Sequence, residues 1–169
     1  MSRALSDPPE PTTGVLGIFH AVITVSEMDR ALAFYRDILG LRVTFDDFHD
    51  PVAIAQLFGL DEPRVRSVIV ECPDHSEVEL IEFDRPRGRS RADRTMPDAG
   101  LAALNLRVSR IEELADRVRA GGFVMSSEVV EQTLPDGATL KVGVCRGPDD
   151  VTVILVEPPA GRRSLGGET

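Results

Sequence analysis

The chain has 169 residues, of which 42% are hydrophobic, and its formal net charge is −9. This length suffices for one domain that buries its own hydrophobic core. The excess of acidic side chains argues against nucleic acid or an anionic membrane as a partner. The sequence has no apolar run long enough to span a bilayer and no secretory signal, which predicts a cytoplasmic protein.

Three segments have the composition of connectors. Residues 1–14 and 160–169 are rich in Pro, Gly, Ser and charged residues, so both ends are expected to be flexible. Residues 85–99 place several arginines among Pro and Gly residues, which favours a linker over a helix or strand. The remainder, 15–159, is predicted to be a single domain in two parts, about 17–84 and about 100–159.

The first part begins with an apolar run at 18–25, which predicts a strand. Ser26 is the expected helix N-cap, and apolar residues then recur at helical spacing as far as Gly40. The stretches 41–48, 64–72 and 76–83 have the alternation of strands, and a Pro-Asp-His-Ser turn joins the last two. The predicted order is therefore βαβββ.

The second part repeats this order. Residues 101–108 form the expected first strand, and Ser109 with Glu112 resembles a capping box ahead of a helix that ends at Gly121. Strands are predicted at 124–132, 138–146 and 151–158. The chain thus consists of two βαβββ modules.

Positions in the two modules can be matched directly. The Val-Ser pair at 25–26 recurs 83 positions later, and the Pro-Asp pair at 73–74 recurs 75 positions later. The first offset aligns His20 with Ala103, and the second aligns Glu79 with Ile154. One module therefore has a polar pair that the other lacks.

The pattern H-x-x-x-x-V-S-x-x-x-x-A-x-x-F-Y-x-x-x-L-G-L from His20, with P-D-x-x-x-x-E-L-I-E from Pro73, resembles the vicinal oxygen chelate superfamily. That superfamily includes glyoxalases, bleomycin and fosfomycin resistance proteins and extradiol dioxygenases. The resemblance extends from about Gly17 to Pro159 and implies an α+β fold. In that fold the two modules form a curved, eight-stranded mixed sheet, a cup with its helices outside, and two chains commonly associate as a homodimer.

Strand alternation leads independently to the same residues. Side chains at every second position share a face, which groups His20 with Thr24 and places Glu79 on one face of its own strand. If the intervening apolar residues pack on the helices, His20 and Glu79 face the cup. An imidazole and a carboxylate in an apolar cup need partners or a chemical role, which makes both candidate catalytic residues.

The resemblance also implies a metal site, with a His from each opening strand and a Glu from each closing strand. His20 and Glu79 match two of these ligand positions, whereas Ala103 and Ile154 offer no donor atom. One imidazole and one carboxylate hold a divalent metal weakly. The expected cofactor is therefore none, or a weakly held divalent metal.

Two further histidines and four polar residues complete the candidates. His75 lies in the predicted turn, outside the cup, and His49 lies in a segment that could fold over its mouth. Four side chains on the cup faces are expected to bind substrate: Thr24, Asn105, Arg107 and Thr152.

Three classes of function remain open. The first is a proton-transfer enzyme, an isomerase, epimerase, cyclase or lyase acting on a small oxygen-rich metabolite. The second is a protein that binds a drug or secondary metabolite without changing it. The third is a glyoxalase or dioxygenase with unusual metal ligands. In each case the partner is a small molecule.

Overall fold

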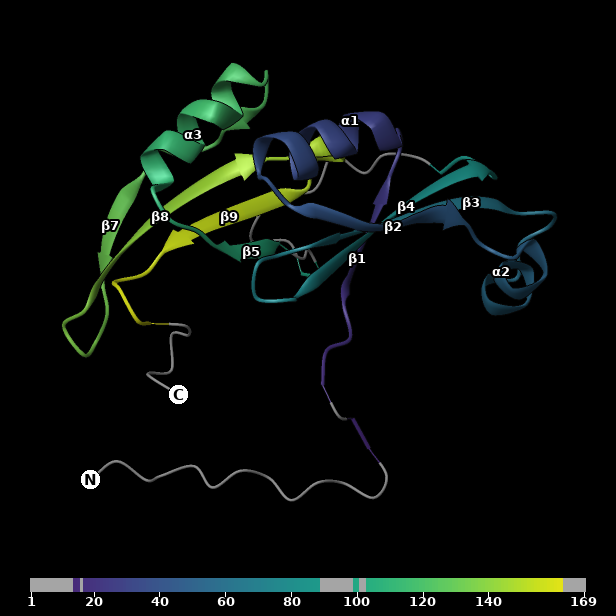
Figure 1. Ribbon diagram of the computed structural model, residues 1–169, viewed down its shortest axis with the longest axis horizontal. Coiled ribbons are helices and arrows are strands. Elements are labelled where there is room, and N and C mark those ends of the chain that lie inside the picture. Colours follow the sequence, from purple (N-terminus) through teal and green to yellow (C-terminus); the bar gives the residue numbers. More distant parts are fainter. Residues whose placement is uncertain (1–13, 16, 89–98, 101–102, 163–169) are drawn as a thin grey trace.

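The computed structural model describes residues 14–15, 17–88, 99–100 and 103–162 (Figure 1). Most of the expected flexible ends, 1–14 and 160–169, and of the expected linker, 85–99, lies outside these residues. Among the described residues, no helix combines the length and the apolar character needed to cross a bilayer.

The first module forms a four-stranded sheet in the order β1-β4-β3-β2. Strand β1 runs parallel to β4, and the other neighbours are antiparallel. The elements are β1 (Ala21–Val25), α1 (Met28–Leu32), the π-helix η1 (Ala33–Ile38), β2 (Arg42–Phe48), α2 (Pro51–Phe58), β3 (Arg64–Glu71) and β4 (Glu77–Arg85).

The second module repeats this plan in a five-stranded sheet ordered β5-β9-β8-β6, with β7 also paired to β8. Strand β5 runs parallel to β9, as β1 does to β4. The elements are β5 (Leu104–Arg107), α3 (Ile111–Ala120), β6 (Val124–Met125), β7 (Val130–Thr133), β8 (Thr139–Arg146), the 3-10 helix η2 (Pro148–Asp150) and β9 (Thr152–Glu157). This is the predicted α+β fold of two βαβββ modules.

The strand expected at 124–132 is divided into β6 and β7. Both Ser126 N and Ser127 N donate to Val144 O, at 2.7 and 3.2 Å. The Ser127 hydroxyl in turn accepts from Val144 N at 3.0 Å. A serine side chain that bonds the neighbouring backbone displaces the regular ladder, which ends β6 early. The described residues therefore contain nine strands, where eight were expected.

Both predicted serine caps are wrong. Helix α1 begins after Glu27, and Ser26 N donates to Asp149 Oδ2 instead. Helix α3 begins after Arg110, and the Glu157 carboxylate at the end of β9 accepts from Arg110 N and Ile111 N at 2.6 and 3.1 Å. A carboxylate 46 residues away in the sequence thus caps α3, which no local pattern can reveal.

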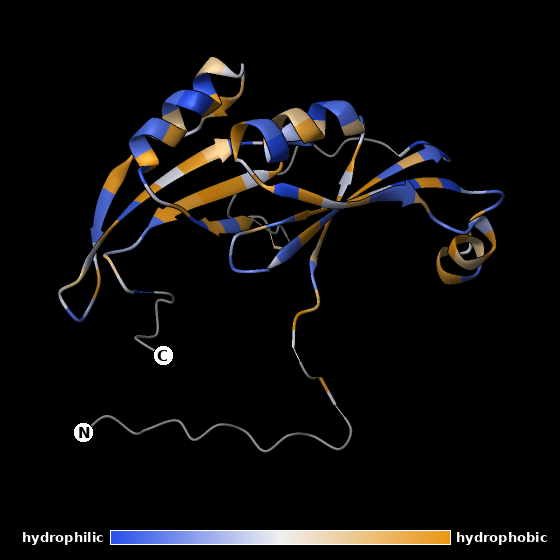
Figure 2. Ribbon diagram, viewed as in Figure 1, coloured by the Kyte–Doolittle hydropathy of each residue, from blue (hydrophilic) through white to orange (hydrophobic). Residues whose placement is uncertain are grey.

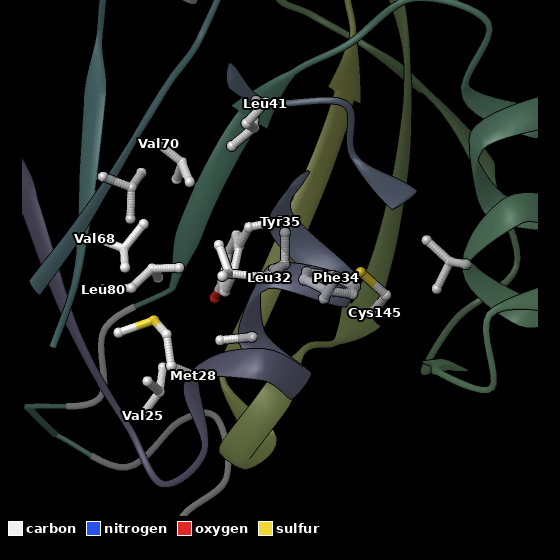
Figure 3. Packing of buried hydrophobic residues seen from close by; sticks show 14 of the residues in the cluster. Val25, Met28, Leu32, Phe34, Tyr35, Leu41, Val68, Val70, Leu80 and Cys145 are labelled. Atoms are coloured by element: carbon white, nitrogen blue, oxygen red, sulfur yellow. The ribbon is translucent and has the colours of Figure 1, made fainter. Parts of the chain in front are cut away.

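A shared core joins the two modules. Figure 3 shows side chains of α1 and η1, such as Phe34 and Tyr35, between Leu80 of the first sheet and Cys145 of the second. The contact is close, because a Cβ at Gly147 would lie 3.2 Å from the Phe34 ring. Apolar and polar segments alternate along the strands in Figure 2, as expected for sheets with one face on a core.

Two equivalent turns link the modules reciprocally. Asp74, between β3 and β4, accepts from Arg107 Nη2 of β5 at 3.0 Å. Asp149, in the matching turn of the second module, accepts from Ser26 N after β1 at 2.9 Å. Each Pro-Asp turn therefore holds the strand-to-helix region of the opposite module.

Candidate functional site

The first sheet has one covered and one open face. Val25, Val78 and Leu80 are buried in the shared core beneath α1. Alternation along β1 and β4 sends His20 and Glu79 to the other face. In Figure 1, α1 and α3 lie on one side of the sheets and α2 on the opposite side, so α2 is the only described helix on this open face, at its far end.

Three side chains surround the carboxylate of Glu79 and form a four-residue cluster with it on the open face. His20 Nε2 lies 3.0 Å from Glu79 Oε2, and His49 Nε2 lies 3.2 Å from Glu79 Oε1. The Ser67 hydroxyl on β3 donates to the same Oε1 at 2.5 Å. Glu79 is only 8% exposed, so these contacts replace the water that its carboxylate would otherwise bind.

The backbone holds His49 at this position. His49 N donates to Val65 O at 2.9 Å, which extends the β2–β3 ladder by one residue. Asp50 then caps α2 by accepting from Val52 N, and Phe58 at the end of that helix packs edge-on against Phe83 of β4. The helix is thereby fixed over the far end of the open face, and His49 lies at its entrance.

The hydrogen bonds constrain how the cluster carries protons. A carboxylate that receives the Ser67 hydroxyl can also accept from both Nε2 atoms when the two imidazoles carry their proton there. In that tautomer Nδ1 of His20 is unprotonated, and this atom is buried with no partner among the described residues. The His20 imidazole can therefore exchange a proton only through its Nε2 atom and Glu79.

The same face of the second module is apolar where the first is polar. Asn105 of β5 lies opposite Ile154 of β9, in the register that Val22 and Glu79 occupy in the first module. Ala103 precedes β5 and is half-buried. Thr152 is buried and accepts from Arg146 Nη1 at 2.9 Å.

Arg107 and Asn105 line a separate cavity. Its volume is about 580 Å³, and it lies between the modules, where the β3–β4 turn meets β5 and the start of α3. His20, His49 and Glu79 are not among its described lining residues. Hydrogen bonds from Ser76 and Arg107 lower the pKa of Asp74 to about 2, so Arg107 faces a firmly ionised partner here.

Thr24 is exposed on the open face, opposite Ile81. Of the four residues predicted to bind substrate, Thr24 alone shares the sheet face of the cluster, because Asn105, Arg107 and Thr152 belong to the second module. Their substrate-binding roles stay predictions. His75 is well exposed and contacts Glu71, as expected for a turn residue outside the cup.

The residues present do not fit the family's metal site. Ala103 and Ile154 have no donor atom, and a second copy of the chain would bring the same two residues. Within the described part of the chain, no group of three His, Cys, Asp or Glu side chains has the arrangement of a metal site. His20, His49 and Glu79 instead bond to one another.

The sequence missed two members of the cluster. The sequence places His49 in a segment that could fold over the cup but does not pair it with Glu79, because that contact depends on the path of the chain after β2. Ser67 gave no signal, since a serine inside an apolar strand is common. Its place on β3, diagonal to Glu79, follows from the register of β3 and β4.

Most of the chain matches one known protein family. The model of the Glyoxalase/Bleomycin resistance protein/Dioxygenase superfamily matches residues 17–155. The chain belongs to this superfamily. A search of curated proteins finds no significant match.

Solved structures support the fold. A glyoxalase family protein from Bacillus cereus has a TM-score of 0.77 at 21% identity, covering 87% of this chain and 97% of its own. A glyoxylase/bleomycin resistance protein/dioxygenase domain from Frankia has a TM-score of 0.61 at 16% identity, covering 86% and 99%. A fosfomycin resistance protein from Listeria monocytogenes, complexed with Mn(II) and sulfate, has a TM-score of 0.58 at 13% identity, covering 87% and 96%. At these identities the likeness shows a shared fold and no particular activity.

Proposed function

We propose that this chain is a proton-transfer enzyme of the superfamily, an isomerase, epimerase, cyclase or lyase acting on a small oxygen-rich metabolite. The observation that carries the proposal is the Glu79 carboxylate held between His20 and His49 at 3.0 and 3.2 Å. Two imidazoles and a carboxylate in direct contact form a chain of groups that can each take or release a proton. The His49 side chain is 34% exposed, so the chain of groups is accessible from solvent at that end.

Each member has a role in this proposal, and His20 holds the second carboxylate oxygen, Oε2, of Glu79. Glu79 removes a proton from a carbon next to a carbonyl group, because it is the only acceptor common to all the contacts of the cluster. Ser67 orients the carboxylate by its hydrogen bond to Oε1. His49, with 34% of its side chain exposed, is the member most open to solvent and exchanges the proton with the substrate or water.

The test is deuterium exchange followed by proton NMR. Small aldehydes, ketones and 2-oxo acids are incubated in D₂O with the protein, and loss of each carbon-bound α-proton signal is measured. The account expects exchange with wild-type protein and its loss in Glu79→Gln. The matched control is Glu77→Gln, a carboxylate two residues away on the same face of β4, which keeps the activity. Equal rates in Glu79→Gln and wild type would refute the proposal.

A second candidate is a binding protein without catalysis, and one observation favours it. Val22 and Phe45 on the open face are 53% and 43% exposed, a surface that a hydrophobic drug could cover. The fosfomycin resistance protein from Listeria monocytogenes shows that the superfamily includes resistance proteins. A binder would retain its ligand in Glu79→Gln and would show no exchange in the wild type.

We also propose a homodimer in the cytoplasm. Strands β1 and β5 each lie at an edge of their sheets, and an edge strand invites pairing with another chain. Ile18 and Phe19, just before β1, are 93% and 87% exposed, which suits burial against a second copy. The free thiols of Cys72 and Cys145 suit a reducing compartment. Light scattering on a sizing column tests the first point, and cell fractionation tests the second.

A further inference from the structure

The open face of the first sheet carries one apolar row, with Glu79 in the middle of it. Across the sheet, Glu79 lies opposite Val22 on one side and opposite Ile69 on the other, and Ile69 in turn lies opposite Phe45. One row further, Ile81 lies opposite Thr24. Ile81 in turn lies opposite Ser67, and Ser67 lies opposite Asp47, so this next row is mainly polar and the apolar surface is confined to the row of Glu79.

Helix α2 adds a wall to this apolar floor. Phe58 meets Phe83 edge-on, with ring centroids 6.5 Å apart, and Phe58 remains 59% exposed. In Figure 2, α2 is coloured mostly as hydrophobic, although it extends away from the core. An aromatic wall therefore stands at one end of the floor that contains Glu79.

The arginines of β3 do not offer a binding partner for an anion on this face. Arg64 and Arg66 lie on the opposite face, where Asp84 and Asp46 engage them, and Arg107 of the second module is engaged by Asp74. The ionisable side chain at the centre of the floor is itself the carboxylate of Glu79. A ligand carboxylate or phosphate placed over the floor would be repelled by the negative charge of Glu79. None of the three arginines just named is free to offset that repulsion.

We infer that the substrate is an uncharged compound with an apolar, ring-sized body and one carbonyl or hydroxyl group beside the acidic carbon. The inference rests on the proposed proton transfer at Glu79. The occupant is a small molecule rather than a second copy of the chain, because a permanent protein interface would bury the polar cluster away from water. The apolar body covers Val22, Ile69 and Phe45, and the oxygen lies toward His20 and His49.

The test compares two probes of equal size, phenylacetone and phenylacetate, by NMR titration of methyl-labelled protein. Phenylacetone is expected to bind at least about tenfold more tightly, since only phenylacetate brings a like charge to Glu79. Glu79→Gln removes that charge, so phenylacetate should bind more tightly and the difference in affinity between the two probes should become smaller. Equal affinities for the two probes in wild-type protein would overturn the inference. Failure of both probes to bind would also overturn it.

Two variants on one strand locate the binding surface. Phe45→Ala should weaken phenylacetone about tenfold, whereas Phe48→Ala should not, because Phe48 lies on the opposite face of β2, beneath Arg64. The two rings have similar exposure, 43% and 48%, so they are matched controls. An equal effect of both, or dissociation of a dimer by Phe45→Ala, would overturn the inference.

The benzylic protons of phenylacetone separate this inference from the proposed function. If phenylacetone binds at Phe45 but its protons exchange equally fast with wild type and Glu79→Gln, the substrate class stands and the catalytic role fails. If those protons exchange only with wild type while phenylacetate binds as tightly as phenylacetone, the catalytic role stands and the substrate class fails.

Discussion

The two modules have the same order of strands and helices but differ in what their sheets present on the open face. In the first, Glu79 gathers His20, His49 and Ser67 around one carboxylate. In the second, the matching position is Ile154. Both sheets keep a parallel opening pair and an apolar inner face, so the difference lies in a few side chains and leaves the backbone plan intact.

This comparison shows how a repeated fold can divide its tasks. The inner faces of both modules contribute to one core, which a change in either module would disturb. The open faces contribute little to that core and are free to diverge. The open face of the first module has a polar cluster. The second module has Ile154 at the position of Glu79, and its buried Thr152 accepts a hydrogen bond from Arg146.

The largest expected effect comes from breaking the polar cluster. Glu79→Gln should lower the deuterium-exchange rate by about 10³-fold, because general base catalysis contributes on the order of 10²–10⁴. Thr152→Val in the second module should leave the rate near wild type, since that hydroxyl bonds only Arg146 among its described neighbours. Comparable losses in both variants would mean that the second module takes part in the chemistry.

A smaller loss is expected when a histidine is removed. His49→Ala should slow exchange by roughly 10–100-fold, since Glu79 loses one of its proton partners but keeps His20 and Ser67. His75→Ala is the matched control, because His75 also contacts a glutamate, Glu71, but is 83% exposed. If both variants behave like wild type, His49 has no part in catalysis.

The helix caps allow a comparison of stability. Glu157→Gln removes the carboxylate charge that accepts from Arg110 N and Ile111 N, and should lower the free energy of unfolding by about 1 kcal/mol. Ser109→Ala should change it little, because the predicted Ser109 cap does not form. Urea denaturation of both variants measures the difference, and the opposite ranking would restore the serine cap.

The sequence could predict the modules because their strands and helices follow local periodicity, and the offset of 83 correctly aligns Met28 with Ile111 as the first residues of α1 and α3. It could also pair His20 with Glu79, since alternation places both on one face. It could not predict the Glu157 cap or the approach of His49, because both depend on contacts between segments far apart in the chain.

The two modules also differ in the polarity of one buried helix residue. Tyr35 of the first module is fully buried, and its hydroxyl has no partner among the described residues, whereas the matching residue is Val118. Figure 3 shows this oxygen among apolar side chains, and burial raises the pKa of Tyr35. Tyr35→Phe should leave stability unchanged or raise it by about 1 kcal/mol. A lower melting temperature would reveal a partner for the hydroxyl.

The smallest effect concerns the reciprocal turns and depends on pH. Hydrogen bonds from Ser76 and Arg107 lower the pKa of Asp74 from 3.8 to about 2. A lowered carboxyl pKa stabilises the fold above pH 3.8, and this contribution is lost as the pH falls toward 2. Asp74→Asn should therefore lower the free energy of unfolding at pH 6. Near pH 2 the variant and the wild type should differ much less in stability. A penalty that does not change with pH would show that the charge of Asp74 is irrelevant.

The most direct test of the central claim measures deuterium exchange before and after metal removal. The claim is that Glu79 and its two histidines transfer protons without a metal, because Ala103 and Ile154 leave the family's ligand set incomplete. Protein treated with a chelator should exchange the substrate proton as fast as untreated protein, and neither sample should contain stoichiometric metal by mass spectrometry. Loss of exchange after chelation, with recovery on adding Mn²⁺, would contradict the account.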